Sequence, residues 1–359
     1  MGRLMNTTNT SFSCPVPNFY HVDPCNVCNL KCRYCHTGVK SSKLTNGIMS
    51  LENYNEILNK IAPHAKDIHL YNNGEPFLNK NIIDIVGVTA AKNIKTTIHS
   101  NLNARTFDEY EADNIVKSGL SVLSTSIDGA SQKTYEMYRI GGNIAISINN
   151  LKQLRAAKLR LKSKTPSLVW SYLIHHYNEH EICKAREIAN DIGVKIVFNP
   201  MIVGNNTDWE SSFHKDRSAL VKLNRMVLLS GLKKWPDNLD VGIDIIKRVM
   251  IKIGTKAKLV RQIIPGYTDQ ITLSSKLPYS CIQPFNTMII DSNGIVLPCC
   301  TVCDDRSSLG NLLTDDIYTL WNNREFMKCR DFLLHFDEKK RVGSVCELGL
   351  CGCGVNTSF

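Results

Sequence analysis

The chain has 359 residues, enough for one large domain and a smaller one. Its net charge is +10, but the basic residues are scattered rather than gathered in an aromatic-studded stripe, so nucleic acid is not an expected partner. No run approaches the roughly 18 consecutive apolar residues of a membrane-spanning helix, and the first residues lack the apolar core of a signal peptide. We therefore expect a cytoplasmic protein with no membrane segment.

Fourteen cysteines are the outlying feature of the composition. Twelve of them fall into two groups, at 25–35 and 281–353, whereas Cys14 and Cys183 stand apart. Because the cytoplasm keeps thiols reduced, a disulfide framework is not expected. The grouping indicates iron–sulfur or metal ligation, and we expect the two isolated cysteines to be structural or incidental.

Short β-rich runs alternate with helical stretches along the first two thirds of the chain. The predicted strands are 19–23, 67–71, 95–100, 122–127, 168–175 and 195–199, and the predicted helices are 51–62, 79–92, 107–118, 131–157 and 179–192. The last helix is expected to end at Gly193. Since parallel strands need crossover connections, six such units predict an α/β fold, a partial (β/α)6 TIM-like barrel that stays open.

The rest of the chain has a different pattern of predicted elements and cysteines. A helix-rich segment at 207–275 is predicted to connect the barrel, at 22–206, to a second domain at 276–359, with an N-terminal extension at 1–21. The second domain combines short strands, a turn at 291–294 and many cysteines. A domain of about 80 residues is small for a stable hydrophobic core unless a bound metal stabilises it. We expect a cysteine-rich α+β domain.

A cysteine motif directly follows the first strand. The string at 28–35, CNLKCRYC, places Cys28, Cys32 and Cys35 at C-x3-C-x2-C spacing. Three thiolates on one loop can hold three irons of a [4Fe–4S] cube, which normally takes four cysteines. The fourth iron is then open, as in catalytic metal sites, and can accept the amine and carboxylate of an amino acid. Zinc is the alternative, because Cys25 adds a preceding C-x2-C.

This string resembles the signature of the radical S-adenosylmethionine superfamily. The resemblance implies two cofactors, a [4Fe–4S] cluster with an open iron and S-adenosylmethionine, and it places Tyr34 beside the cofactor adenine. After the second strand, the string NNGEP at 72–76 is similar to the family's G-G-E-P element. That similarity implies that Asn73, Gly74, Glu75 and Pro76 bind the methionine ammonium, with Asn73 standing where a glycine is usual.

Three further strand ends fit the same family. The third strand ends in Ser100-Asn101, which resembles the family's T-N-G element, with Leu102 in place of the glycine. Ser126, at the end of the fourth strand, is expected to bond the cofactor ribose. Arg139 resembles the arginine that pairs with the methionine carboxylate in related enzymes, a contact that suits a planar guanidinium better than an ammonium.

The resemblance also implies the chemistry. An electron from a donor such as flavodoxin or ferredoxin breaks the C5′–S bond of S-adenosylmethionine, giving methionine and a 5′-deoxyadenosyl radical that takes hydrogen from a substrate C–H bond. The protein orients the cofactor and excludes solvent. A protein that uses its clusters only as an electron carrier or redox sensor is the rival class. The open-iron spacing argues against it, since a carrier gains nothing from an incomplete ligand set.

The second cysteine group resembles the auxiliary-cluster domains called SPASM or, in short form, twitch. Gly294 is expected to form a hairpin turn that brings Cys281 and Cys299 together. The full SPASM spacing is absent, so we expect one auxiliary [4Fe–4S] cluster, with zinc as the alternative. Its predicted ligands are Cys281, Cys299, Cys346 and either Cys351 or Cys353, whereas the roles of Cys300, Cys303 and Cys329 stay open.

The resemblance specifies the chemistry better than the substrate. We expect a small molecule, carbohydrate-like or a cyclitol, that is oxidised or epimerised at a C–H carbon. Modification of a ribosomal peptide is the alternative. Since only about 20 residues precede the first strand, a fused N-terminal peptide-recognition domain is not expected, although a separate carrier protein could replace one.

Overall fold

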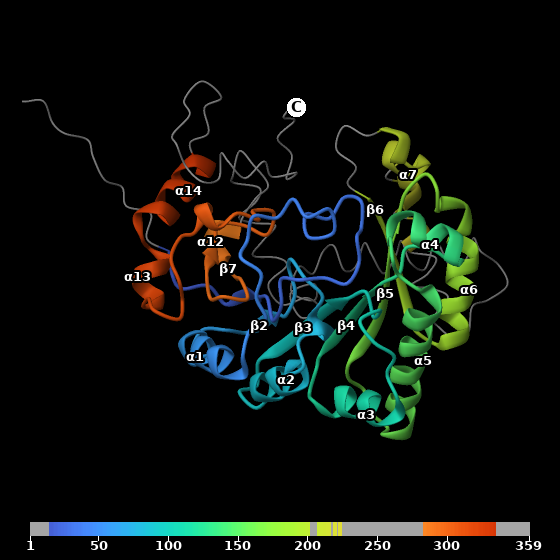
Figure 1. Ribbon diagram of the computed structural model, residues 1–359, viewed down its shortest axis with the longest axis horizontal. Helices are drawn as coiled ribbons and strands as arrows, with labels where there is room; N and C mark the ends of the chain where they lie inside the picture. The colour runs from blue at the N-terminus through green and yellow to red at the C-terminus, as the bar shows by residue number, and fades with distance from the viewer. Residues whose placement is uncertain (1–13, 202–206, 217, 221, 225–282, 335–359) are drawn as a thin grey trace, which may run out of the picture.

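A computed structural model of the chain describes residues 14–201, 207–216, 218–220, 222–224 and 283–334 (Figure 1). These residues form an eight-stranded sheet in the order β6-β5-β4-β3-β2-β1-β7-β8, in which only the β7–β8 pair is antiparallel. The strands are β1 (Phe19–Val22), β2 (Asp67–His69), β3 (Lys95–Ser100), β4 (Val122–Ser126), β5 (Ser167–Ile174), β6 (Lys195–Pro200), β7 (Thr287–Ile290) and β8 (Val296–Leu297). The six predicted parallel strands of the open barrel are confirmed.

The first six helices lie between successive parallel strands, and the later ones follow β6 or flank the β7–β8 pair. The helices are α1 (Leu51–Ile61), α2 (Ile82–Ala90), α3 (Glu109–Lys117), α4 (Gln132–Tyr138), α5 (Ile144–Arg160), α6 (Ile182–Ile192), α7 (Ser212–Lys215), α12 (Gln283–Asn286), α13 (Ile317–Trp321) and α14 (Arg324–Leu334). Short 3₁₀ turns lie at η1 (Pro76–Leu78), η2 (Glu179–Glu181), η3 (Thr207–Trp209) and η4 (Asp305–Ser307). Helix α6 ends at Gly193, whose φ of +77° is left-handed, so the predicted stop is confirmed.

One predicted helix, at 131–157, is two helices in the structure. Gly141 has a φ of +82°, a conformation that ends the helical path after α4. Asn143 then caps α5, its side chain accepting a hydrogen bond from the Ala145 N–H at 2.9 Å. The break leaves Arg139 as the C-cap residue of α4, next to the cysteine loop.

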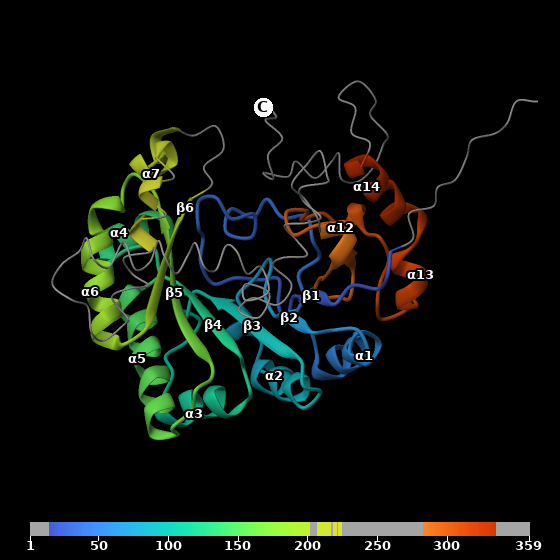
Figure 2. The ribbon, with the colours of Figure 1, turned by 180° about the vertical axis from the view of Figure 1, so that it is seen from behind.

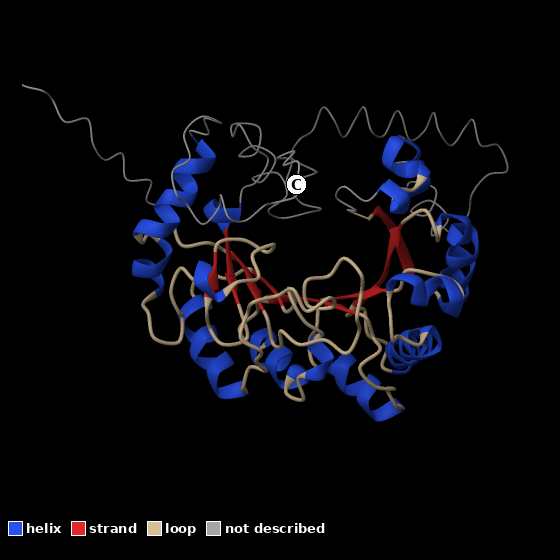
Figure 3. Ribbon diagram, turned by 45° about the horizontal axis from the view of Figure 1, so that its top comes forward, coloured by secondary structure: helices blue, strands red, loops and turns tan. Residues whose placement is uncertain are grey.

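The two faces of the sheet differ in polarity. Figure 3 shows the helices along the outer side of the curved sheet. Tyr20, Ile68, Ile98, Leu123 and Trp170 are buried among the apolar residues of the main core. Each contributes about 1.5–3 kcal/mol of stability on burial. The alternate strand residues point to the opposite, inner face, because side chains alternate along a strand, and they are less buried.

The C-terminal residues continue the barrel sheet. Strand β7 lies parallel to β1, with Phe19 opposite Thr287, although the two strands come from opposite ends of the sequence. Gly294 has a φ of +81° and its N–H donates to the Asp291 carbonyl at 3.1 Å, which confirms the predicted turn. Figures 1 and 2 show α13 and α14 at the β7–β8 end of the sheet, on the side away from β6.

A second contact ties the same two parts of the chain together. The Lys60 ammonium, at the end of α1, donates to the carbonyl oxygens of Leu312, Leu313 and Asp315 at 2.6–3.1 Å. The four-part division of the chain stays a prediction, because the predicted boundaries at 206 and 275 lie outside the described residues. Within the described part, no helix combines the length and apolar character that crossing a bilayer requires.

Candidate active site

The loop after β1 carries the three predicted cluster cysteines. Burial raises the pKa of the Cys28 thiol to about 12, and the charges of Glu75, Cys32 and Cys35 raise it further. The pKa of Cys32 is also raised by burial, lowered by Arg139 and raised by Cys35. The three thiols therefore lie within electrostatic range of one another. Holding them as thiolates requires a strong compensating charge, as a bound metal centre supplies.

Contacts with the end of α4 hold this loop in place. The Lys31 N–H donates to the Ile140 carbonyl at 3.0 Å, and the Arg33 guanidinium donates to the Met137 carbonyl at 3.0 Å. At Gly38, an added Cβ would come within 2.6 Å of the Cys32 backbone nitrogen and oxygen. The loop thus folds back on itself at a glycine that sequence reasoning missed, since no motif marks it.

A cluster and a single zinc ion make different demands on the thiols. Tetrahedral zinc needs four ligands converging on one point, whereas the thiolates of a cube bind different irons. Cys25, the fourth ligand of the zinc alternative, is buried, and its thiol donates to the Val27 carbonyl at 3.3 Å.

The segment after β2 packs directly against the backbone at the start of the cysteine loop. At Gly74, an added Cβ would overlap the Cys25 carbonyl oxygen and come within 2.8 Å of the Val27 oxygen. The Glu75 N–H donates to that same Val27 carbonyl at 2.9 Å. The glycine is required here because two backbones pass each other without room for a side chain.

Asp23 fixes the start of this segment. Its fully buried carboxylate accepts hydrogen bonds from the Asn73 backbone N–H and side-chain amide at 3.1–3.4 Å. Burial raises the pKa of Asp23 to about 8, against the lowering effect of these hydrogen bonds. Asn73, where the family has a glycine, is therefore held by a carboxylate that sequence reasoning did not single out.

The Glu75 carboxylate joins the ends of two strands. It accepts hydrogen bonds from the Ser100 hydroxyl at 2.7 Å, the Asn101 N–H at 2.8 Å and the Phe77 N–H at 3.1 Å. Burial raises its pKa and these hydrogen bonds lower it. Since a carboxylate offers about four lone-pair sites, most of its capacity is used within the protein. The contact of Glu75 with the cofactor ammonium stays a prediction, and it would use the lone-pair site that these three hydrogen bonds leave free.

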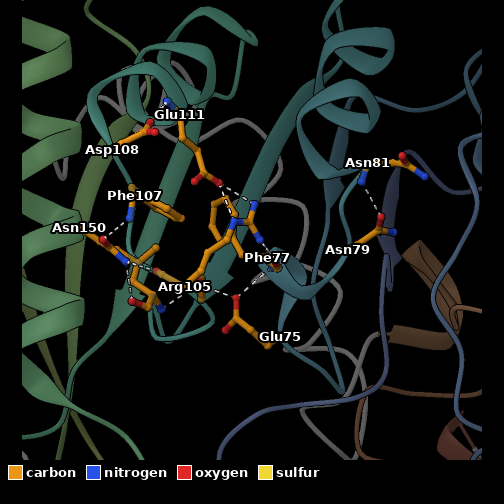
Figure 4. Close-up of polar contacts among 11 residues, drawn as sticks. Glu75, Phe77, Asn79, Asn81, Arg105, Phe107, Asp108, Glu111 and Asn150 are labelled. Atoms are coloured by element: carbon orange, nitrogen blue, oxygen red, sulfur yellow. Dashed lines mark hydrogen bonds and ion pairs between the residues drawn. The ribbon is translucent and has the colours of Figure 1, made fainter.

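Figure 4 shows the support behind Glu75. The Arg105 guanidinium donates to the Phe77 carbonyl and to Glu111 Oε1, the latter at 2.8 Å, and lies 5.9 Å from the Phe107 ring centre. Pro76 begins η1, a position where its missing N–H costs nothing. These contacts fix the direction in which the segment leaves β2.

The end of β3 faces the cysteine loop. The Asn101 side-chain nitrogen lies 3.7 Å from Cys28 Sγ and 3.1 Å from Asn29 Oδ1. Leu102 has a φ of +49°, in the left-handed region that favours glycine. Its side chain is buried in the core, which offsets the backbone strain. The residue that replaces the family's glycine thus keeps a glycine-like backbone.

Arg139 lies between a buried carboxylate and a cluster cysteine. Its Nε is 2.6 Å from Asp128 Oδ2, and its Nη1 is 3.7 Å from Cys32 Sγ. Burial acts to lower the pKa of Arg139, but Asp128 and Cys32 raise it, so the guanidinium stays charged. Because a guanidinium has five N–H donors, Arg139 keeps donors for a ligand carboxylate.

An aromatic cage lies beside the same loop, formed by Tyr34, Tyr138, His175, Tyr177 and Trp209. The Tyr34 and Trp209 ring centres are 5.5 Å apart, and those of His175 and Trp209 are 4.8 Å apart. Both ring nitrogens of His175 are buried without a hydrogen-bond partner, which is rare in folded proteins. Burial lowers the pKa of His175 to about 4, so its ring is neutral. Since His175 is fully buried, the partly exposed rings Tyr34 and Tyr177 are the ones that can face a planar group such as adenine.

Of the five cage residues, only Tyr34 was predicted from the sequence. No signal marks the other four: His175, for example, ends a predicted strand, and Trp209 falls in the predicted connector. Ser126, the predicted ribose contact, lies partly exposed at the end of β4, opposite Ser171 of β5.

The described part of the second cysteine group touches the first site. The Cys303 thiol donates to Asn73 Oδ1 at 3.0 Å. Burial raises its pKa to about 12, and the charges of Asp23 and Cys35 raise it further. Cys299 and Cys329 are buried. Four predicted ligands lie outside the described residues, so the auxiliary site stays a prediction: Cys281, Cys346, Cys351 and Cys353.

Comparisons with known proteins agree with this geometry. Residues 22–189 match the model of the radical SAM superfamily, and residues 281–353 match that of SPASM, an iron–sulfur cluster-binding domain. These matches agree with an open α/β barrel that carries a thiol-bearing loop after its first strand. The chain belongs to the radical SAM superfamily and carries a C-terminal SPASM domain, so its cofactors are [4Fe–4S] clusters and S-adenosylmethionine.

Similar proteins differ widely in what they act on. An AdoMet-dependent heme synthase of Methanosarcina barkeri is 24% identical over 46% of this chain, and the match spans 45% of that protein. A GTP 3′,8-cyclase of Desulforamulus reducens is 24% identical over 60% of this chain and 67% of its own length. The structure of anSMEcpe with bound AdoMet is 17% identical, covers 88% of this chain and 87% of its own, and has a TM-score of 0.59. The last likeness shows the fold.

Proposed function

We propose that this enzyme cleaves S-adenosylmethionine reductively at a [4Fe–4S] cluster held by Cys28, Cys32 and Cys35, and removes a hydrogen atom from a substrate C–H bond. The bound cluster and cofactor supply the 5′-deoxyadenosyl radical. The observation that carries the proposal is the convergence of three thiols with the Asn101 amide and the Arg139 guanidinium, each 3.7 Å from a different thiol sulfur. Polar N–H groups facing thiolate sulfurs stabilise their negative charge.

The surrounding residues divide the remaining tasks. We assign the cofactor carboxylate to the free donors of Arg139, and the adenine to the partly exposed rings of the aromatic cage, Tyr34 and Tyr177. The close crossing at Gly74 presents the backbone of residues 72–76 to the cofactor ammonium. The apolar and aromatic neighbours of the cysteine loop exclude water, which protects a reactive radical from side reactions.

We further propose a carbohydrate-like or cyclitol substrate that is oxidised or epimerised, with an electron donor such as flavodoxin or ferredoxin in the cytoplasm. The support is the inner face of the sheet, where Ser126 and Ser171 lie opposite each other and Asn199 follows on β6. Such side chains match hydroxyl groups. Modification of a ribosomal peptide is the alternative substrate class.

The test uses the full chain, reconstituted anaerobically with iron and sulfide, then reduced with dithionite in the presence of S-adenosylmethionine. We expect 5′-deoxyadenosine to form in the wild type and to be lost in Cys32→Ala. Cys183→Ala is the matched control, because Cys183 is an exposed cysteine on α6, away from both groups. The control should retain activity and iron.

The outcomes separate the rival readings. Bound zinc with no iron after reconstitution would contradict the cluster. Bound iron that is reduced without forming 5′-deoxyadenosine would favour the electron carrier or sensor. Equal loss of activity in Cys32→Ala and Cys183→Ala would indicate general destabilisation rather than a site.

A further inference from the structure

The inner face of the sheet carries a group of stacked rings that the proposed cofactor site does not use. We call His21, His69, Tyr71 and His99 the imidazole array. His21 and His69 are opposite each other in the β1–β2 register, and their ring centres are 4.9 Å apart. The Tyr71 ring stacks between those of His69 and His99, at 5.2 and 4.1 Å. Strand alternation therefore gathers four ring side chains on one face.

The array lies next to residues of the proposed cofactor site. Tyr71 directly precedes the 72–76 segment, and His99 directly precedes Ser100, which bonds Glu75. The charge of Cys300, in the second cysteine group, lies near enough to raise the pKa of Tyr71. The array thus occupies the inner face between the cysteine loop and the C-terminal residues.

Internal hydrogen bonds fix which ring atoms face a ligand. His21 Nδ1 is 3.2 Å from the Tyr71 carbonyl oxygen, which only accepts, so the proton is on Nδ1 and Nε2 is left as an acceptor. The Tyr71 hydroxyl is 2.9 Å from His69 Nδ1, and His69 Nε2 is 3.7 Å from Asp67 Oδ1. A carboxylate next to Nε2 favours the proton there, so the hydroxyl donates to Nδ1. The chain Asp67–His69–Tyr71 therefore orients the array.

The array is electrically neutral. Burial lowers the pKa of His69 to about 3 and of His99 to about 4, and the nearby His21 ring lowers both further. The charged groups next to it are Asp67, Lys95, which lowers the pKa of Asp67, and Cys300, which raises the pKa of Tyr71. Asp67 and Lys95 have opposite signs, and a Cys300 thiolate is negative. A phosphate or carboxylate ligand would find no unpaired cation beside the rings.

The neighbouring residues on this face add both hydroxyl and apolar side chains: the Phe19 ring lies against His21 and His69, Ile289 is opposite His21, and Val169 is opposite Ser124. Ser124 is opposite His99 in the β3–β4 register, and Ser126 lies two residues further along the same face. The one cation in the same row, Lys195, is the first residue of β6 and is exposed. The imidazole acceptors and these hydroxyls match the donors and acceptors of a polyol.

We propose that the imidazole array binds the substrate, and that this substrate is an uncharged ring bearing several hydroxyl groups rather than a phosphorylated compound or a peptide. The inference rests on the proposed function, because it assigns the substrate of the same reaction. His21 Nε2 and the His99 ring accept or donate hydrogen bonds to substrate hydroxyls. Asp67 and Tyr71 are positioning residues that hold His69.

The test measures binding to the anaerobically reconstituted full chain with S-adenosylmethionine present, by isothermal titration calorimetry. The probes are myo-inositol and D-glucose, their phosphates, and a short neutral peptide. We expect saturable binding of a neutral polyol, and binding of its phosphate at least about tenfold weaker. In His21→Phe and His99→Phe, the ratio of polyol affinity to S-adenosylmethionine affinity should fall about tenfold, as the loss of one or two hydrogen bonds implies.

Two controls separate binding from folding. His180→Phe changes an exposed histidine on η2 and should leave that ratio unchanged. Tyr71→Phe keeps the stacked ring and removes only the hydroxyl that fixes His69, so its ratio should fall less than in the histidine variants. A purely structural role would lower the affinities for both ligands together.

Several results would overturn the proposal: no polyol binds, a phosphate or the peptide binds better, or the histidine variants keep the wild-type ratio. The same preparations are assayed for 5′-deoxyadenosine. Protein that cleaves S-adenosylmethionine but binds no polyol refutes this inference alone. Protein that binds polyols through the array without cleaving the cofactor refutes the proposed function alone.

Discussion

The crossing of two backbones at Gly74 gives the sharpest test of how the site is built. A Cβ at this position would overlap the Cys25 carbonyl oxygen and lie 2.7 Å from the Cys25 carbonyl carbon and 2.8 Å from the Val27 oxygen. All three are backbone atoms, so no side-chain rotation relieves the contact. In Gly74→Ala the cysteine loop must move, and overpacking of this kind costs about 1–3 kcal/mol.

The displaced atoms come directly before Cys28 in the chain. We therefore expect Gly74→Ala to lower the free energy of unfolding by about 1–3 kcal/mol and also to reduce iron binding at the first cluster. The matched control is Gly87→Ala on α2, where an added Cβ meets nothing within 4 Å. Alanine in a helix interior is better than glycine, so the control should gain about 0.5–1 kcal/mol.

The assays are denaturant unfolding of both variants and iron content after anaerobic reconstitution. If Gly74→Ala matched the wild type in stability and in iron per chain, the close crossing would not exist as described. If it lost stability but kept full iron, the cysteine loop would be positioned independently of the 72–76 segment.

Three further changes test other parts of the structure. The pKa of Asp23 in the folded protein is about 8, above its ordinary value of 3.8. The stability that Asp23 contributes is therefore fully present below pH 3.8 and is lost as the pH rises through 8. In Asp23→Asn, the free energy of unfolding should fall less steeply between pH 3.8 and pH 8. Leu102→Gly relieves a left-handed backbone, worth about 1–2 kcal/mol, but removes a buried leucine, worth about 2–5 kcal/mol, so chemical denaturation should show a net loss; a net gain would mean that strain outweighs packing. Cys299→Ala should lower bound iron by about one four-iron cluster while some cofactor cleavage remains, and unchanged iron would exclude Cys299 as a ligand.

Much of the barrel could be predicted from the sequence because its signals are local. Alternating apolar residues and helix caps act over a few residues, so the six strands and the stop at Gly193 were found. The split between α4 and α5 was missed, since Gly141 and the Asn143 cap lie inside a continuous helical pattern. The cysteine motif at 28–35 is also a local signal, because three cysteines on one loop need no long-range contact to be neighbours, and their role as ligands stays a prediction.

The remaining features depend on pairing between distant segments. That Asp23 holds Asn73, that Glu75 joins β2 to β3, and that Cys303 meets the 72–76 segment follow from strand order and register. Strand order and register cannot be inferred from any single stretch of sequence. The same holds for β7, which pairs with β1 from the far end of the chain.

The cage and the imidazole array show this division most clearly. The sequence alone determined which residues are candidate iron ligands and which strand ends carry polar motifs, because those properties belong to residue type and local spacing. Only the tertiary structure decided that His175 is buried beside Trp209 and that His21, His69 and His99 share one face. Each of these residues looks ordinary until parallel pairing brings its strand beside the next.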